Sequence, residues 1–236
     1  ITSQYLSALL LTLPLAEQDS SILVEDLHER PYLGMTIRFL REQNIEFKQL
    51  SDKNFDVFKI KGGQRYSPFQ KTIPSDFSSA SYLIAAAALL PGESVLTGID
   101  MSDTQGDKRL VYILQEMGAD IQINDSELLI SGGKKLNGVK IDANDIPDLV
   151  PTLAVIGTQA EGTTHITNVK QARLKETDRI HSMAKELKKM GARIEEQKDG
   201  LSVKKSALHG CVLHGYSDLR TVMALAVAGL LAEEET

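Results

Sequence analysis

The stretch SDFSSASYLIAAAALLPGESVLTGI, residues 75–99, decides the fold, because three other parts of the chain repeat its plan. Polar residues open the stretch, small and aliphatic residues follow, and a short β-branched run closes it. The other copies are TSQYLSALLLTLPLAEQDSSILV (2–24), DIPDLVPTLAVIGTQAEGTTHITNV (145–169) and YSDLRTVMALAVAGLLAEEET (216–236), which stops before its β-branched run. Leu83 and Leu153 lie 70 residues apart at matching positions. Each copy predicts a buried helix, because apolar residues surround it on nearly every side.

A second kind of segment lies between these copies and has one apolar and one polar face. Segments 32–47, 108–123 and 179–196 each read as an amphipathic helix followed by a strand. Hairpin signals follow in INDSELLI (123–130) and EEQKDGLSV (195–203). The predicted repeat is therefore helix, strand, helix, strand, strand, with a period near 70 residues.

That period indicates an α/β (α+β) domain built from a few similar units. Common solenoid repeats run about 20 to 50 residues, so a longer period favours units arranged around a shared centre. We expect buried helices inside, and mixed sheets that face solvent through one layer of amphipathic helix. The proline of TIPSDF (72–77) follows the polar run KGGQRYSPFQK, which places the domain boundary between 1–71 and 72–236.

The composition excludes several kinds of partner. The net charge of -6 argues against nucleic acid or an anionic membrane as the main partner. Cys211 is the single cysteine and the five histidines lack zinc spacing, so we expect neither a disulfide nor a bound metal. No apolar run reaches the roughly 18 residues of a membrane span. Residues 1–18 look like the other repeat copies rather than a signal peptide, and we expect a cytoplasmic protein.

Polar and charged clusters at the helix starts have two interpretations. The clusters are Thr2-Ser3-Gln4, Asp76 with Ser78 and Ser79, Asp145 with Asp148, and Ser217 with Asp218. Such side chains commonly cap helices by accepting hydrogen bonds from free backbone amides. Alternatively, parallel buried helices point their positive ends at one cleft and bind an anion there. The stretch QARLKETDRIHSM (171–183) is equally open: it is a solvated helix start, or a site that holds an anion and moves a proton.

Seven motifs give the chain a resemblance to the 5-enolpyruvylshikimate-3-phosphate (EPSP) synthase family. In chain order they are TSQYLSALL, ERPY, SDFSSASYLIAAAAL, TQGDKR, IPDLVPTLA, RLKETDRI and YSDLR. The resemblance implies two similar domains, each with three βαβαββ units, and an active site between them. Residues 1–71 would be the last unit of the first domain, on the shikimate-phosphate side, and 72–236 most of the second. It also implies a chain that is incomplete at both ends, inactive when isolated, and a monomer when complete.

The family's reaction, as the resemblance implies it, transfers the carboxyvinyl group of phosphoenolpyruvate to the 5-hydroxyl of shikimate 3-phosphate. Phosphate leaves, and the product serves chorismate and aromatic amino acid biosynthesis. Positioned acid/base side chains suffice for this chemistry, without metal or organic cofactor. The resemblance assigns the proton transfers to Asp148 and Glu176, with Lys175 as a third catalytic residue. It also implies inhibition by glyphosate through Lys175 and Arg179.

The resemblance also implies two sets of binding residues. The expected phosphoenolpyruvate ligands are Arg179, Arg220 and Gln4, and the expected shikimate 3-phosphate ligands are Thr2, Ser3, Gln4, Tyr32, Asp148, Gln171 and Lys175. Guanidinium groups suit carboxylate and phosphate because they donate two parallel hydrogen bonds.

Three residues depart from the family's pattern. Thr2 replaces the more usual serine, which is a small change. Glu29 stands where many members have a phosphate-binding serine, and a carboxylate there repels phosphate unless Arg30 or another cation screens it. Leu219 replaces the usual histidine. Two alternatives remain: the related carboxyvinyl transferase that acts on UDP-N-acetylglucosamine, which depends on a loop cysteine, and a non-catalytic fragment.

Overall fold

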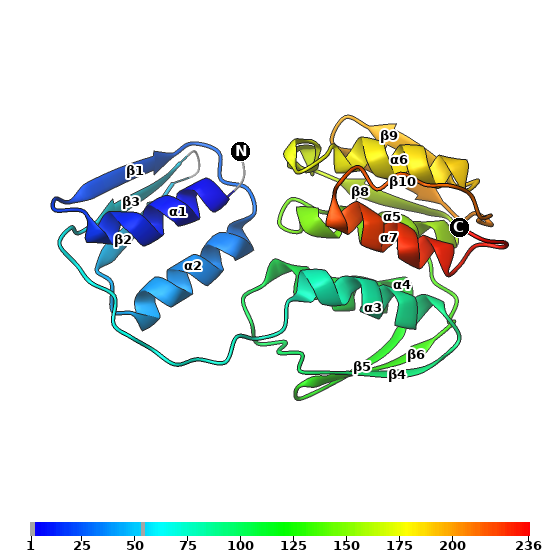
Figure 1. The fold of residues 1–236 in the computed structure, drawn as a ribbon, viewed down its shortest axis with the longest axis horizontal. Helices are drawn as coiled ribbons and strands as arrows, with labels where there is room; N and C mark the ends of the chain where they lie inside the picture. Colours follow the sequence, from blue (N-terminus) through cyan, green and yellow to red (C-terminus); the bar gives the residue numbers. More distant parts are fainter. Residues whose placement is uncertain (1–2, 53–54) are drawn as a thin grey trace. The chain divides into compact units, whose positions relative to one another are not determined.

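A computed structural model describes residues 3–52 and 55–236 and shows the predicted repeat three times (Figure 1). The first copy is α1 (Gln4–Thr12), β1 (Ser20–Val24), α2 (Arg30–Glu42), β2 (Phe47–Ser51) and β3 (Asp56–Ile60). The second is α3 (Phe77–Leu89), β4 (Gly92–Thr97), α4 (Arg109–Met117), β5 (Asp120–Asn124) and β6 (Glu127–Gly132). The third is α5 (Val150–Gln159), β8 (Thr163–Thr167), α6 (Arg179–Lys189), β9 (Arg193–Gln197) and β10 (Gly200–Lys204). Strand β7 (Lys140–Asp142) precedes the third copy, and α7 (Leu219–Gly229) follows it. The α/β class with repeated units is confirmed.

The chain divides into two compact units. The first comprises Ile1–Ile73 with the short segment Thr104–Gly106, and the second comprises Pro74–Asp103 and Asp107–Thr236. Each unit has its own core: Leu10, Leu40 and Phe58 are fully buried in the first, and a larger cluster around Leu153 fills the second.

Each sheet has one face on helices and the other in solvent. The first two sheets, with strand orders β1-β3-β2 and β4-β6-β5, are antiparallel, and the third, β7-β8-β10-β9, contains one parallel pair. In the third sheet, Ile194 and Val203 form a buried cross-strand pair, while the neighbouring pair, Glu195 and Ser202, lies on the opposite, outer face. Helices α5 and α6 both contact this sheet, and the outer face is polar. The expectation that a helical layer separates every sheet from solvent is therefore wrong, and only the third sheet is mixed.

Helices α3, α5 and α7 pack side by side in the second unit (Figure 1). Every residue of α5 from Val150 to Thr158 is buried, as predicted for a helix that is apolar on nearly every side. Helix α1 differs, since Tyr5, Leu9 and Leu11 are exposed and only Leu6 and Leu10 are buried. The first unit contains one repeat, so α1 packs mainly against α2 and lacks neighbours like those around α5.

Capping explains some of the polar clusters. The Asp76 carboxylate accepts hydrogen bonds from the backbone N–H groups of Ser78 and Ser79, at 3.0 and 3.1 Å, and so caps α3. Asp218 caps α7 in the same way. Asp148 does not cap α5, because it lies in the 3₁₀ turn η3 (Pro147–Leu149) and its carboxylate contacts arginine side chains. Capping therefore does not explain Asp148, whose carboxylate pairs with Arg179 and Arg220.

Replacing Leu153 by alanine is expected to lower the free energy of unfolding by about 2–5 kcal/mol, because the side chain is fully buried. The matched change Leu83→Ala, at the equivalent position of α3, should cost no more than about 0.5 kcal/mol because Leu83 is 63% exposed. Urea denaturation of this chain, followed by circular dichroism, measures both. Equal losses for the two variants would contradict the burial difference between the repeats.

Candidate active site

The guanidinium group of Arg179 joins three carboxylates that come from different parts of the second unit. Its Nε donates to Asp218 at 2.8 Å, one terminal nitrogen donates to Asp148 at 2.6 Å, and the other donates to Glu176 at 2.6 Å. Arg179 is 2% exposed and Asp218 1% exposed. The structure therefore brings together Asp148, Glu176 and Arg179, three of the residues assigned to the site from the sequence.

Arg220 joins the same cluster through Asp148. A terminal nitrogen of Arg220 lies 2.9 Å from the second carboxylate oxygen of Asp148, so this carboxylate bridges the two arginines. The side chain of Arg220 is 23% exposed and that of Glu176 is 65% exposed. Lys175, next to Glu176 in the chain, is partly exposed. The accessible part of the cluster consists of Glu176 and Arg220, whereas Arg179 lies beneath them.

Asp218 has two roles, one for each carboxylate oxygen. Its Oδ1 accepts hydrogen bonds from the backbone N–H groups of Arg220 and Thr221, at 2.8 and 3.2 Å. Its Oδ2 accepts from Arg179. The sequence identified Asp218 only as part of a helix-start cluster and missed its contact with Arg179. The sequence did contain a signal for a role at the site, because Asp218 lies two residues before Arg220, an expected phosphoenolpyruvate ligand.

The segment that carries Lys175 and Glu176 is fixed at its base by Arg173. This side chain donates to the backbone carbonyl oxygens of Gln197 and Lys198, in the turn of the β9–β10 hairpin. It also donates to the carboxylates of Asp178 at 2.7 Å and Glu196 at 2.8 Å. Asp178 in turn caps α6. Arg173, which the sequence did not assign to the site, thus anchors the loop between the 3₁₀ turn η4 (Lys170–Leu174) and α6.

The charges of the cluster nearly cancel. The cluster contains three carboxylates, Asp148, Glu176 and Asp218, and two guanidinium groups, Arg179 and Arg220. Burial opposes the charge of Arg179, but its hydrogen bond to Asp218 and the negative charge of Asp148 outweigh this effect and raise the Arg179 pKa. The three carboxylates therefore offset the positive charge that an anion would meet at these arginines.

Tyr82 is a residue near this cluster that the sequence did not single out. It lies on α3, is 4% exposed, and its hydroxyl has no hydrogen-bond partner among the described residues. Burial raises the pKa of Tyr82, although the positive charge of Arg220 opposes the shift. Its position in the run SSASYLI gave no signal beyond that of a core residue.

The remaining predicted residues of the second unit and of the first are placed as follows. Gln171 is 3% exposed and donates to the backbone oxygen of Asn144 at 2.8 Å. In the first unit, Ser3 is 4% exposed and lines a hollow along α1 and β1, Gln4 is exposed, and Tyr32 is partly exposed. Thr2 lies outside the described residues.

Glu29 holds the serine that was expected to bind phosphate. Its carboxylate accepts a hydrogen bond from the Ser3 hydroxyl at 3.0 Å and from the Ser3 backbone N–H at 3.2 Å, and Glu29 is 2% exposed. Arg30, which was considered as a screening cation, instead pairs with Asp56 at 2.9 Å. The carboxylate of Glu29 therefore occupies the start of α1, where an anion is favoured.

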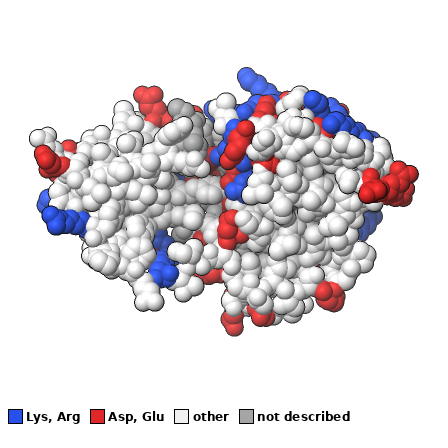
Figure 2. Space-filling model, viewed as in Figure 1, with Lys and Arg blue, Asp and Glu red and all other residues white. Residues whose placement is uncertain are grey.

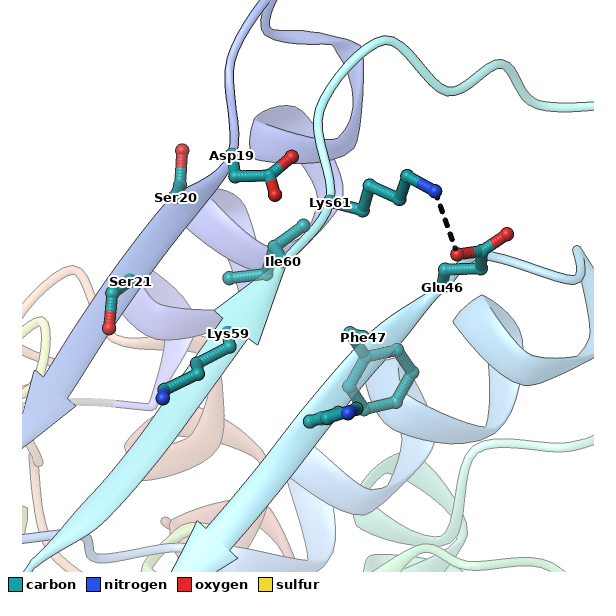
Figure 3. Close-up of a pocket in the computed structure, with 9 residues that line it drawn as sticks. Asp19, Ser20, Ser21, Glu46, Phe47, Lys59, Ile60 and Lys61 are labelled. Atoms are coloured by element: carbon teal, nitrogen blue, oxygen red, sulfur yellow. Dashed lines mark ion pairs between the residues drawn. The ribbon is translucent and has the colours of Figure 1, made fainter.

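A separate hollow of about 630 Å³ lies on the first unit and contains none of the predicted residues (Figure 3). Lys48 and Lys59 lie directly opposite each other on β2 and β3, and Lys61 pairs with Glu46 at 3.5 Å. The face of the molecule in Figure 2 carries Lys and Arg among Asp and Glu, without a large area of one sign.

Two negative findings concern the described residues alone. None of the described helices combines the length and apolar character needed to cross a membrane. Within residues 3–52 and 55–236, no group of three or more His, Cys, Asp or Glu side chains is placed to hold a metal ion.

Solved structures identify the class of the fold as that of the enolpyruvyl transferases. The EPSP synthase from Acinetobacter baumannii matches with a TM-score of 0.78 and 26% identity, over 99% of this chain and 55% of that chain. The enolpyruvyl transferase NikO from Streptomyces tendae has the same fold, with a TM-score of 0.72 and 22% identity over 94% of this chain and 51% of that chain.

Sequence comparison places the chain within one family of that class. The family model of EPSP synthase (3-phosphoshikimate 1-carboxyvinyltransferase) matches residues 1–236. Relatives with the name 3-phosphoshikimate 1-carboxyvinyltransferase include those of Acetivibrio thermocellus (48% identity), Ruminiclostridium cellulolyticum (49%) and Methanococcus maripaludis (46%), each matching 100% of this chain. The chain belongs to the EPSP synthase family, and it spans about 55% of the length of these relatives.

Replacing Arg179 by methionine is expected to destabilise the second unit by about 3–5 kcal/mol, because the change leaves the buried Asp218 carboxylate without its cationic partner. Arg220→Met should cost less than half as much, since Asp148 retains Arg179 and is 17% exposed. Thermal and urea unfolding of this chain provide the comparison. An Arg179 variant as stable as the Arg220 variant would show that the buried pair is not the stabilising element.

Proposed function

We propose that the protein containing this chain transfers the carboxyvinyl group of phosphoenolpyruvate to the 5-hydroxyl of shikimate 3-phosphate and releases phosphate. The observation that carries the proposal is the joining of Asp148, Glu176 and Arg220 around the Arg179 guanidinium. Membership of the EPSP synthase family supports the choice of substrates. Because the chain spans about half the length of its relatives, the reaction is proposed for the whole protein.

The proposed reaction has two steps with opposite proton transfers. In the first, the 5-hydroxyl oxygen bonds to C2 of phosphoenolpyruvate, the hydroxyl proton passes to a base, and C3 gains a proton. In the second, the C2–O bond to phosphate breaks and C3 loses a proton, which leaves the carboxyvinyl ether. We assign Asp148 to the hydroxyl, Glu176 to C3, and Lys175 to the bridging oxygen or the phosphate. General acid/base catalysis of this kind needs groups within hydrogen-bond reach of the reacting atoms.

The arginine contacts suggest how the substrate prepares Glu176. The Glu176 carboxylate accepts a hydrogen bond from Arg179 at 2.6 Å. A phosphoenolpyruvate anion that approaches Arg179 and Arg220 competes with Glu176 and Asp148 for the same nitrogens. Glu176 is mostly exposed and can turn away, whereas Asp218 is buried and keeps Arg179 in place. Substrate binding thus releases the carboxylate that the chemistry needs.

Ser3, Gln4 and Tyr32 in the first unit are proposed as ligands of shikimate 3-phosphate, as is Thr2, which lies outside the described residues. In the second unit, Gln171 is proposed as a ligand of the same substrate. The partial exposure of Tyr32 and the hollow beside Ser3 support this assignment. The same proposal includes a monomeric, cytoplasmic enzyme whose partners are these small molecules, and the net charge of -6 supports the absence of a nucleic-acid partner.

Phosphate release from shikimate 3-phosphate plus phosphoenolpyruvate tests the function, in the full-length protein and in this 236-residue chain. Glu176→Gln in the full-length protein should lower kcat by about 10²–10⁴-fold, which is the usual contribution of an acid/base group, and leave the Kd for phosphoenolpyruvate within a few-fold. A full-length wild type that releases no phosphate would reject the function. Equal losses of binding and turnover in the variant would reject the proton-transfer role.

Replacing Glu29 by serine should lower the KM for shikimate 3-phosphate in the full-length protein. The change removes a buried negative charge and frees the Ser3 hydroxyl, which now donates to Glu29. The KM for phosphoenolpyruvate should stay the same, which serves as the internal control in steady-state assays. An unchanged or higher KM for shikimate 3-phosphate would place its phosphate away from Ser3.

A further inference from the structure

A second buried carboxylate, that of Glu186, ties α6 to the segment that leads into α7. The Glu186 side chain is fully buried and accepts three hydrogen bonds: from the Tyr216 hydroxyl at 2.7 Å, the His214 backbone N–H at 2.9 Å and the Lys189 ammonium at 2.6 Å. Burial disfavours the charge, but these donors hold the pKa of Glu186 below its ordinary value. Glu186 is therefore an ionised group that is hydrogen-bonded to the segment 214–216 at His214 and Tyr216.

The segment that leads into α7 contains two consecutive residues with a strained backbone. Tyr216 and Ser217 have φ angles of 51° and 53°, a left-handed conformation that is unfavourable for residues with a Cβ atom. Such a conformation persists only where the surroundings determine it. The Tyr216 backbone N–H donates to Nδ1 of His214 at 3.0 Å, and the two rings meet edge to face with centroids 4.5 Å apart. The Tyr216 side chain is thus held from both ends.

The strained pair directly precedes Asp218, which starts α7 and holds Arg179. Helix α6 begins with Arg179 and carries Glu186 two turns further along. The two helices are therefore joined at two places, by Arg179 with Asp218 and by Glu186 with Tyr216. Together with the packing of α7 against α3, α5 and α6, these two hydrogen bonds restrict the direction in which the Arg220 side chain leaves the helix.

We propose that Glu186 and Tyr216 are positioning residues for Arg220, and that their hydrogen bond holds the strained turn that aims Arg220 at phosphoenolpyruvate. The inference rests on the proposed function for the identity of the ligand. Neither residue belongs to the Arg179 cluster, and neither was among the predicted site residues. Burial and the Glu186 carboxylate raise the pKa of Tyr216 to about 12, so its hydroxyl keeps its proton and remains a donor at neutral pH.

Tyr216→Phe and Glu186→Gln in this chain test the geometric part. Each weakens or removes the bond at 2.7 Å, so the turn should open more often and expose the Arg220 and Thr221 amides, which Asp218 caps. Amide hydrogen exchange measured by NMR should quicken about tenfold at these two amides, as expected for the loss of a hydrogen bond to a charged group, and not at Leu153 in α5. Unchanged exchange at both amides would overturn the proposal.

Steady-state kinetics of Tyr216→Phe in the full-length protein test the functional part. The KM for phosphoenolpyruvate should rise about tenfold, while kcat and the KM for shikimate 3-phosphate stay within about twofold. A merely structural role would lower stability without this selectivity, so an unchanged KM for phosphoenolpyruvate, or equal rises for both substrates, would overturn the proposal.

Tyr66→Phe is the matched control, because it also removes one tyrosine hydrogen bond, to the backbone oxygen of Leu11 at 2.7 Å in the first unit. It should change neither the exchange at Arg220 nor the KM for phosphoenolpyruvate. A wild type that does not use phosphoenolpyruvate would reject the proposed function, and the exchange measurement alone would then decide whether Glu186 and Tyr216 hold the turn.

Discussion

The buried ion pair between Arg179 and Asp218 is the interaction on which the site of the second unit depends. A guanidinium that is 2% exposed is stable only when its donors are satisfied, because water cannot replace the missing partners. Its three carboxylate partners precede three different helices: Asp148 lies before α5, Glu176 before α6 and Asp218 before α7. The helix starts are therefore held together by charge, while apolar side chains such as Leu153 hold the helix bodies.

The order of the elements was predictable because it depends on periodicity within single segments. The amphipathic segment 179–196 became a helix and a strand. The apolar stretch 145–169 became α5, which is buried from Val150 to Thr158, and the strand β8. The neighbours of each element were not predictable in the same way. Leu83 and Leu153 occupy equivalent repeat positions, yet one is 63% exposed and the other is buried, because burial depends on which other helices are present. The prediction that a layer of helix separates the sheets from solvent was wrong for the same reason.

The identities of the site residues came from motifs, but their contacts did not. Asp148, Glu176, Arg179 and Arg220 meet in the structure, whereas nothing in the sequence indicated that one guanidinium would bind three carboxylates. The role of Asp218 at the site was not predicted because capping already explained this residue. In the structure, its second carboxylate oxygen accepts a hydrogen bond from Arg179. Glu29 was recognised as unusual in sequence, but its hydrogen bond to Ser3 requires the turn at φ 58° that starts α2.

In each unit, a carboxylate of the chain contacts a side chain that we propose as a ligand of a substrate anion. Glu29 accepts from Ser3 in the first unit, and Asp148 accepts from Arg220 in the second. These contacts keep the donors ordered and partly desolvated before a ligand arrives, which lowers the cost of organising them on binding. They also make the affinity for a ligand depend on the difference between two interaction free energies, that of the donor with the ligand and that of the donor with the carboxylate of the chain. A multiply charged ligand can replace Asp148 at Arg220, because Asp148 still has Arg179 as a partner. Glu29 is buried, so a ligand that binds Ser3 must either displace the Glu29 carboxylate or bind beside its negative charge. The electrostatic surroundings of Ser3 and Arg220 therefore differ: a buried carboxylate contacts Ser3, whereas the carboxylate at Arg220 is shared with Arg179.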